Sequence, residues 1–366
     1  MLMVIVLIVM VIGSLIFHFI APWHALPLAS NWKNMDDTLT ITFVVTGVFF
    51  VVLNGFLAYT LLKYRRGAGH QKGAAYQPVD HKMERWLTIV TAVGIAALLA
   101  PGLSVYADFV RPPTGAMEVE VLGNQWQWRY RLPGADHKMG RSDARFISPT
   151  NPFGLDPDDP AGNDDGIIEG NELRLPQGRP IKMLLRSIDV LHDYYVPQFR
   201  ARMNMVPGQV SSFWFTPTAP GRYEAMCAQL CGVGHAAMRG AVVVMPAEAF
   251  DSWARTLPTR TTPAQADMSG PVAIGQALAK NKGCVACHSI DGAAGVGPSW
   301  KGLFGKTESF VDGSQAKVDQ AFLVKEISEP TARVVKGFAP VMPKSELSEA
   351  EVAALAAYIE SLGKQP

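Results

Sequence analysis

Long apolar runs dominate the first 110 residues of the chain. Each is close to the roughly 20 residues that a helix needs to cross the hydrocarbon core of a bilayer. A soluble domain rarely holds three such runs in so short a stretch, so we predict a transmembrane helical region over residues 1–110. The three runs are Met1–Ile20, Leu39–Leu62 and Trp86–Ala107.

The first run has two interpretations, because a secretory signal peptide is also apolar and N-terminal. Such a peptide begins with basic residues, whereas the first Lys or Arg of this chain is Lys33. We therefore expect Met1–Ile20 to be a retained helix, with a cleaved signal peptide as the alternative.

Charged residues between the runs predict the orientation of the helices. Basic residues crowd the loop between the second and third runs, whereas the loop before it holds Lys33 beside Asp36 and Asp37. Since basic loops stay in the cytoplasm, residues after about Asp108 should lie on the periplasmic side of a bacterial inner membrane. The basic residues are Lys63, Arg65, Arg66, Lys72, Lys82 and Arg85.

The pattern changes at Met117 to short alternating segments separated by Pro and Gly. Such spacing predicts a β-sandwich or barrel, here over residues 111–256. An acidic insert from Asp156 to Glu169 offers carboxylates for Ca²⁺, but its spacing differs from an EF-hand, and we interpret it as a solvated loop without Ca²⁺. The predicted strands are Met117–Tyr130, Ile181–Leu185, Ser211–Thr216, Arg222–Met226 and Ala241–Met245, followed by a helix over Ala247–Arg255.

A polar segment, Leu257–Gly270, is rich in Pro, Thr and Ala and predicts a linker. Residues 271–366 then read as a separate all-α domain, with helices over Val272–Lys282 and Ser348–Leu362. The net charge of +1 gives no reason to expect a nucleic-acid partner.

All four cysteines fall into two motifs that suit redox metals. The first is a loop with Cys227, Cys231, His235 and Met238, and His192 supplies a second imidazole from elsewhere. Soft thiolate, thioether and imidazole ligands favour copper. A disulfide leaves the other ligands unexplained, and zinc does not favour Met.

The second motif is Cys284-Val-Ala-Cys287-His288, the attachment signature of a c-type haem. Gly297-Pro298-Ser-Trp300 follows it, and Pro340-Val-Met342-Pro343 comes later. This order resembles small class I cytochromes c, particularly those fused to subunit II in caa3-type oxidases. The resemblance implies that Met342 is the distal iron ligand and that Pro298 lies against His288.

Residues Asp37 to about Ser252 resemble subunit II of cytochrome c oxidase, through Gly123-Asn-Gln125-Trp126-Gln-Trp128, Asp189-Val-Leu-His192 and the copper loop. The resemblance implies a cupredoxin-like fold and a CuA centre of two copper ions. In it Cys227 and Cys231 bridge the ions, His192 and His235 each bind one, and Met238 and the Gln229 carbonyl complete the set. Most members carry Glu at position 229, so Gln229 weakens the case for the family's interfacial Mg²⁺.

The same resemblance implies an electron-input subunit that passes electrons from haem c to CuA and on to the haem of catalytic subunit I. The donor would be a bc1-type complex or a soluble cytochrome c. Trp126 lies on the electron path or is a core aromatic residue. Glu84 is the mouth of a proton channel or a carboxylate favoured at a helix N-terminus. A nitric oxide reductase subunit and a membrane-anchored carrier without an enzyme partner remain alternative functions.

Overall fold

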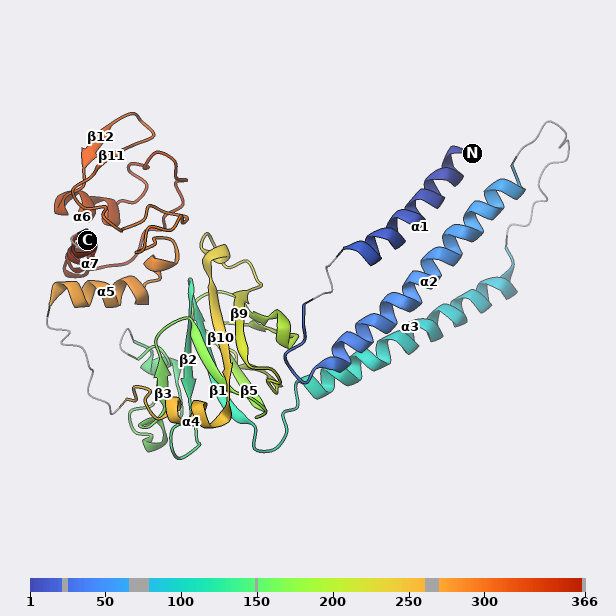
Figure 1. The fold of residues 1–366 in the computed structure, drawn as a ribbon, viewed down its shortest axis with the longest axis horizontal. Helices are drawn as coiled ribbons and strands as arrows, with labels where there is room; N and C mark the ends of the chain where they lie inside the picture. The colour runs from blue at the N-terminus through green and yellow to red at the C-terminus, as the bar shows by residue number, and fades with distance from the viewer. Residues whose placement is uncertain (22–25, 66–78, 149–150, 261–269, 364–366) are drawn as a thin grey trace. The chain divides into compact units, whose positions relative to one another are not determined.

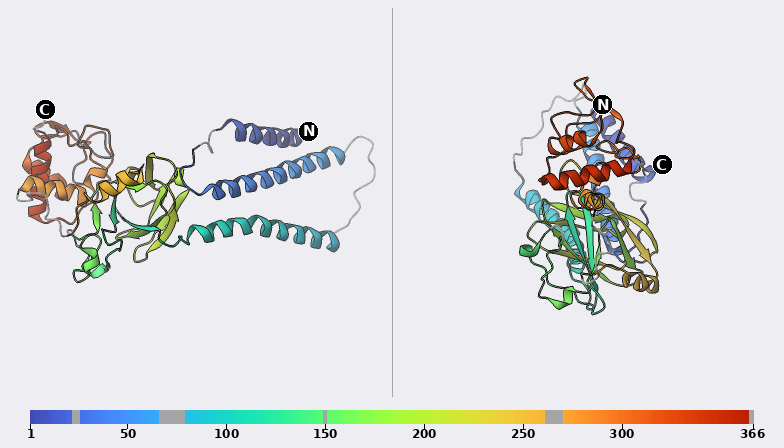
Figure 2. Two further views of the ribbon diagram at one scale, coloured as in Figure 1. Left: turned by 60° about the horizontal axis from the view of Figure 1, so that its bottom comes forward. Right: turned by 90° about the vertical axis from the view of Figure 1, so that its left-hand side faces the viewer.

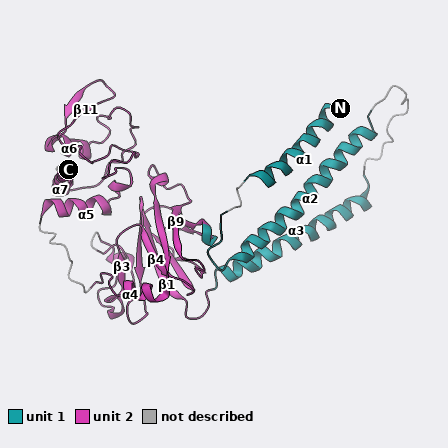
Figure 3. Cartoon of the chain, in the orientation of Figure 1, with its two compact units in different colours: residues 1–111, 198–200 teal, residues 112–197, 201–366 magenta. Residues whose placement is uncertain are grey.

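The computed structural model of the chain describes residues 1–21, 26–65, 79–148, 151–260 and 270–363 (Figure 1). They form two compact units, which Figure 3 shows in different colours. Residues 1–111 with 198–200 make the helical unit, and residues 112–197 with 201–366 make the redox-motif unit.

The helical unit confirms the three predicted helices, and each is long and apolar enough to cross a membrane. In Figures 1 and 2, α1 runs beside α2, and α3 returns antiparallel to α2. The second and third helices are longer than the apolar runs, because polar residues beside the runs are also helical. Asp80 begins α3 by accepting hydrogen bonds from the amides of Lys82 and Met83. The helices are α1 (Leu2–Ile20), α2 (Lys33–Lys63) and α3 (His81–Phe109).

Most side chains on these helices are exposed, including large apolar ones. This is typical of helices that face lipid or other membrane helices. Arg66 and Lys72, which contribute to the predicted orientation, lie outside the described residues.

A short segment, Gln198–Arg200, belongs to the helical unit although its neighbours in sequence do not. The Ser30 hydroxyl donates to the carbonyl of Phe199 at 2.8 Å. Arg200 makes a two-point ion pair with Asp36, at 2.7 and 2.9 Å. The sequence pattern gives no sign of this arrangement.

The region after Met117 confirms the predicted sandwich as two five-stranded sheets, with orders β3-β2-β1-β5-β8 and β4-β10-β9-β6-β7. Neighbouring strands are antiparallel except for β1 with β5 and β4 with β10. The strands are β1 (Met117–Asn124), β2 (Gln127–Leu132), β3 (Gly166–Ile168), β4 (Glu172–Pro176), β5 (Ile181–Ser187), β6 (His192–Val196), β7 (Ala201–Met205), β8 (Ser211–Phe215), β9 (Gly221–Cys227) and β10 (Arg239–Met245), and the helix α4 spans Ala247–Ala254.

Alternation of buried residues places the core between the sheets. Val119 and Val121 of β1 and Met183 and Leu185 of β5 are fully buried, as expected where one face of each strand meets the opposite sheet. The predicted strand Met117–Tyr130 is two strands, because the chain turns between Asn124 and Gln127. Short 3₁₀ turns lie at Ala144–Phe146, Pro160–Gly162, Pro197–Phe199, His235–Ala237 and Cys284–Ala286.

The acidic insert is solvated only in part: Asp158 and Glu169 are exposed, as the sequence interpretation expects, whereas Asp165 corrects it. Asp165 is fully buried, and Arg131 donates to it at 2.6 Å. Arg131 also donates to the buried Glu120 at 2.6 Å, and Arg186 donates to the other oxygen of Glu120 at 2.6 Å. Buried charges persist only when paired in this way, so the network fastens the insert to the outer face of the first sheet.

The linker prediction is only partly compatible with the contacts. Leu257 packs against Gly166, the Pro258 carbonyl accepts from the Ile167 amide at 2.9 Å, and Arg260 donates to the Asp156 carbonyl at 2.8 Å. These contacts favour a domain boundary after Arg260. The remaining linker residues, 261–269, lie outside the described residues.

The C-terminal domain is helical, with one small hairpin that the pattern did not predict. Trp300, Leu323, Leu355 and Ile359 belong to its buried core. Ser348 begins the last helix with a capping box to Glu351. The elements are α5 (Pro271–Asn281), β11 (Thr307–Ser309), β12 (Gln315–Lys317), α6 (Gln320–Ser328) and α7 (Glu349–Leu362).

Candidate metal and haem sites

The second sheet brings the copper-motif residues together. His192 is the first residue of β6, Cys227 is the last of β9, and these two strands are paired. The loop that carries Cys231, His235 and Met238 then leads into β10. Strands that belong to a packed sandwich thus hold both ends of the loop.

Sulfur, nitrogen and oxygen donors converge there. The two thiol sulfurs lie 3.7 Å apart. Cys227 Sγ is 3.9 Å from His192 Nδ1 and 3.2 Å from the Gln229 carbonyl oxygen. Cys231 Sγ is 3.5 Å from His235 Nδ1 and 3.9 Å from Met238 Sδ. Each thiol therefore has one imidazole beside it and lies close to one weaker donor.

His192 is fully buried and held from its far side by Asp189. Asp189 Oδ1 lies 2.8 Å from His192 Nε2 and fixes the ring so that Nδ1 faces the thiols. Burial opposes a charge on the ring, but the hydrogen bonds with Asp189 and Cys227 raise the pKa of His192 to about 9.

The two thiols have opposite acidities. The hydrogen bond between the two thiols lowers the pKa of Cys227, against the effect of burial, and His192 adds to the decrease. The same hydrogen bond and burial raise the pKa of Cys231. The loss of the first proton therefore belongs to the pair of thiols rather than to one of them, as expected for coupled groups. A bound metal would displace both thiol protons.

This donor set fits copper. Thiolate, imidazole and thioether are ligands that copper prefers, and all of them are present here. Among the described residues, His192, Cys227 and Cys231 form the only group of three His, Cys, Asp or Glu side chains close enough to share one ion.

Trp126 contacts the copper loop directly. Its Nε1 donates to the Cys231 carbonyl at 3.1 Å, and Gln125 Nε2 donates to the same oxygen at 2.8 Å. A Cβ at Gly234 would lie 2.3 Å from Trp126 Cδ2, so this glycine makes room for the indole. The close approach explains the glycine that precedes His235.

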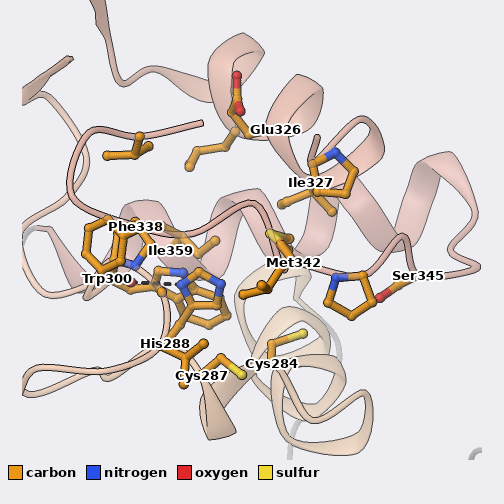
Figure 4. A pocket seen from close by; sticks show the side chains of 18 of the residues that line it. Cys284, Cys287, His288, Trp300, Glu326, Ile327, Phe338, Met342, Ser345 and Ile359 are labelled. Atoms are coloured by element: carbon orange, nitrogen blue, oxygen red, sulfur yellow. Dashed lines mark hydrogen bonds between the residues drawn. The ribbon is translucent and has the colours of Figure 1, made fainter. Parts of the chain in front are cut away.

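A large cavity in the C-terminal domain collects the haem-motif residues (Figure 4). Cys284, Cys287 and His288 line it from the CxxCH turn, and Met342 lines it from the later Pro-rich segment. Most of the remaining wall is apolar, with Leu303, Leu323, Ile327, Phe338, Leu355 and Ile359. The cavity therefore offers two thiols, an imidazole and a thioether in an apolar surround, which fits a c-type haem.

The orientation of His288 is fixed. Its Nδ1 lies 2.8 Å from the Pro298 carbonyl, as the resemblance implied for Pro298, and its ring stacks on Trp300 with centroids 5.2 Å apart. A Cβ at Gly297 would lie 2.5 Å from the ring. Nε2 is thus the nitrogen available for an axial ligand. Burial raises the pKa of Cys284 to about 11 and also raises the pKa of Cys287.

Residues of the copper region reach this cavity. Trp126 and Val233 are among its lining residues. Gly283, which precedes the CxxCH motif, has φ +71°, and a Cβ there would lie 2.5 Å from the Gln125 carbonyl oxygen. Trp126 therefore lies between the two sets of ligands.

Glu84 is not brought to either set of ligands. It lies in the first turn of α3, its side chain is 70% exposed, and one of its carboxylate oxygens lies 3.5 Å from His81 Nδ1. Both interpretations of Glu84, as a proton-channel mouth and as a helix N-terminal carboxylate, remain predictions.

Several residues that shape the sites escaped the sequence analysis. Asp189 was noted only as part of the segment around His192, although a carboxylate three residues before a ligand histidine is a signal for such support. The roles of Gly234, Gly283 and Trp300 depend on contacts between distant segments, and nothing in their local patterns reveals these contacts.

Comparisons with known proteins agree with this geometry. Residues 117–245 match the family "Cytochrome C oxidase subunit II, periplasmic domain", and residues 272–363 match the family "Cytochrome c". The alternative cytochrome c oxidase subunit 2 of Bradyrhizobium diazoefficiens is 50% identical over 248 residues, which cover 68% of this chain and 89% of that protein. Cytochrome c oxidase subunit 2 of Alkalihalophilus pseudofirmus is 23% identical over 339 residues, which cover 89% of this chain and 86% of that protein.

Among solved structures, the periplasmic domain of subunit II of cytochrome oxidase from Bradyrhizobium japonicum matches with 24% identity and a TM-score of 0.29. That match covers 40% of this chain and 96% of the other. With its two matching families and its relative of 50% identity, the chain belongs to the cytochrome c oxidase subunit II family of haem–copper oxidase subunits and carries a C-terminal cytochrome c domain.

Proposed function

We propose that this chain is the electron-input subunit of a caa3-type cytochrome c oxidase. When bound, its haem c and its two copper ions would relay electrons to a catalytic subunit that reduces O₂ to water and translocates protons. The observation that carries the proposal is the position of Trp126. Its indole nitrogen donates to the Cys231 carbonyl, and the residue also lines the cavity that holds Cys284, Cys287 and His288.

The protein's own groups suit rapid electron transfer. Asp189 locks His192, and the Pro298 carbonyl locks His288. Ligands that are already held in place need little rearrangement when a centre changes charge, and preorganisation of this kind lowers the barrier. Cys227, Cys231 and His192 are buried, which keeps water away from most of the copper donors.

The setting of the subunit follows from its helices. We propose that α1–α3 lie in a bacterial inner membrane against lipid and the catalytic subunit, with the sandwich and cytochrome domains on the periplasmic side. Their exposed apolar side chains support this. A bc1-type complex or a soluble cytochrome c would supply the electrons, and Glu84 would accept protons at the cytoplasmic end of α3.

The test is purification of the complex in mild detergent, followed by copper and haem analysis and an O₂-consumption assay. We expect two coppers and one covalent haem per chain, a co-purifying catalytic subunit and O₂ uptake. A chain that elutes alone would instead indicate a carrier without an enzyme partner. Reduction of nitric oxide without O₂ uptake would indicate a nitric oxide reductase.

A further inference from the structure

An ion pair lies in the wall of the haem cavity and has no part in ligating the iron. Arg333 Nη2 and Nε donate to the same oxygen of Glu326, at 2.6 and 3.0 Å. The side chains are only 26% and 18% exposed, and both residues line the cavity. Withdrawing such a pair partly from water carries a desolvation cost that its Coulombic attraction offsets only in part.

The position of the pair in the cavity is informative. In Figure 4, Glu326 of α6 lies across the cavity from Cys284 and Cys287, with Met342 between the two ends. The thioether bonds of a c-type haem are made by the vinyl side of the porphyrin, and its two propionates extend from the opposite side. The cysteines therefore direct the propionates toward the end where Glu326 and Arg333 lie.

Arg333 is equipped to bind a carboxylate there. Stacking of its guanidinium on Phe310, with Cζ 4.5 Å from the ring centroid, holds it in place. Within the described residues its Nη1 makes no hydrogen bond, so both N–H groups of Nη1 remain for an acceptor. The other Lys or Arg in the cavity wall, Lys282, comes two residues before Cys284 and so lies at the cysteine end.

We infer that Arg333 pairs with a haem propionate and that Glu326 is a positioning residue that holds its guanidinium. The inference rests on the proposed haem site. Without Arg333, a propionate beside Glu326 would place like charges together, which is unfavourable at a partly buried site. A cation near the haem stabilises the reduced form and an anion stabilises the oxidised form, so the two residues shift the haem potential in opposite directions.

The test compares the haem midpoint potential of the intact complex in the wild type and in variants, by redox titration with absorption spectroscopy. Arg333→Gln should lower the reduction equilibrium constant about tenfold, equivalent to about 59 mV for one electron, and Glu326→Gln should raise the potential. Lys325→Gln is the matched control, because Lys325 is an exposed cation that lies beside Glu326 on α6 but outside the cavity wall. It should shift the potential by less than about 20 mV, roughly a twofold change in the constant.

Two results would overturn the inference: a shift in Arg333→Gln no larger than that in the control, or an unchanged or lowered potential in Glu326→Gln. If Arg333→Gln fails to acquire haem, the haem potentials of Arg333→Lys and Glu326→Gln test the inference instead. Arg333→Lys should lower the haem potential by less than the shift of about 59 mV expected for Arg333→Gln. An unchanged or lowered potential in Glu326→Gln contradicts the inference. A wild-type chain without covalent haem would refute the proposed function itself.

Discussion

Trp126 donates its indole N–H to the carbonyl of Cys231 at 3.1 Å while it also lines the haem cavity. Both interpretations of this residue, core aromatic or part of an electron path, remain predictions. Trp126 is 8% exposed, so it is buried, but the residues it touches belong to the copper loop and the CxxCH turn.

Replacement of Trp126 by Phe tests this path. The phenyl ring keeps an aromatic group in the cavity wall but cannot donate to the Cys231 carbonyl. We expect the copper and haem absorption bands to persist and the rate of electron transfer between the two centres to fall by about tenfold, equivalent to about 1.4 kcal/mol in activation free energy. Stopped-flow reduction of the intact complex measures the rate.

Trp253→Phe is the control for this variant. Trp253 lies on α4, where it packs against Phe250 and Arg174, away from both ligand sets. The rate of electron transfer in the Trp253→Phe variant should equal that of the wild type. Equal rates in the Trp126 and Trp253 variants would return Trp126 to a purely structural role.

Gly283→Ala should disturb the approach between the haem turn and Trp126. The new Cβ would lie 2.5 Å from the Gln125 carbonyl oxygen. Gly302→Ala is a matched control, because Gly302 also has positive φ (+60° against +71°) but nothing lies within 4 Å of its Cβ position. Both changes should cost about 1–2 kcal/mol through backbone strain, but only Gly283→Ala should slow transfer between the centres.

The measurement is the same stopped-flow assay, with thermal unfolding as the stability readout. A slow rate in both variants would point to general strain in the cytochrome domain rather than to the contact with Gln125.

Much of this molecule can be predicted from its sequence because each part has a strong local signal. Apolar runs predict the helices, alternation predicts the longer strands, and the spacing within the Cys227–Met238 loop and the CxxCH turn predicts the metal and haem donors. The pattern does not predict β3, β4, β6 and β7, and β3 has only three residues, too few for a clear period. They form because the neighbouring strands offer unpaired backbone groups.

What the sequence could not predict depends on partners that are distant along the chain. A run of acidic residues is normally solvated, and the buried state of Asp165 becomes apparent only when Arg131 is placed beside it. Likewise, the ion pair of Arg200 with Asp36 joins residues 164 positions apart.

A truncated soluble chain tests the boundary after Arg260. Residues 112–260 should fold and bind copper without the cytochrome domain, whereas residues 112–256 lack Leu257 and the Pro258 carbonyl that accepts from Ile167. Loss of a half-buried Leu and of the hydrogen bonds of Pro258 and Arg260 should cost about 2 kcal/mol and lower the Tm by roughly 4–8 °C. Calorimetry measures the Tm of each chain, and the absorption spectrum shows whether copper is bound. Equal Tm values would favour the earlier boundary at Leu257, and loss of the copper spectrum in both would show that the domains depend on each other.

Met342→Leu and Met238→Leu should affect separate centres. Each replaces a thioether by an apolar group of similar size, so changes in packing are small. Loss of a Met ligand should lower the haem potential in the first variant and remove its sulfur–iron absorption band. The second should perturb the copper spectrum and leave the haem unchanged. A haem that is unaltered by Met342→Leu would remove this residue from the ligand set.

Gln229→Glu tests the interfacial magnesium site. The Gln229 carbonyl oxygen lies 3.2 Å from Cys227 Sγ, and a carbonyl is present whatever side chain the residue carries. We therefore expect the copper spectrum of the variant to match the wild type.

The half-buried side chain of residue 229 would, however, change from a neutral amide to a carboxylate, the ligand that hard cations prefer. Manganese added in place of magnesium, with paramagnetic resonance as the readout, should bind the variant complex at least about tenfold more tightly, equivalent to about 1.4 kcal/mol. Stoichiometric manganese in the wild type would show that Gln229 does not weaken the site, because the catalytic subunit would then supply enough oxygen ligands by itself.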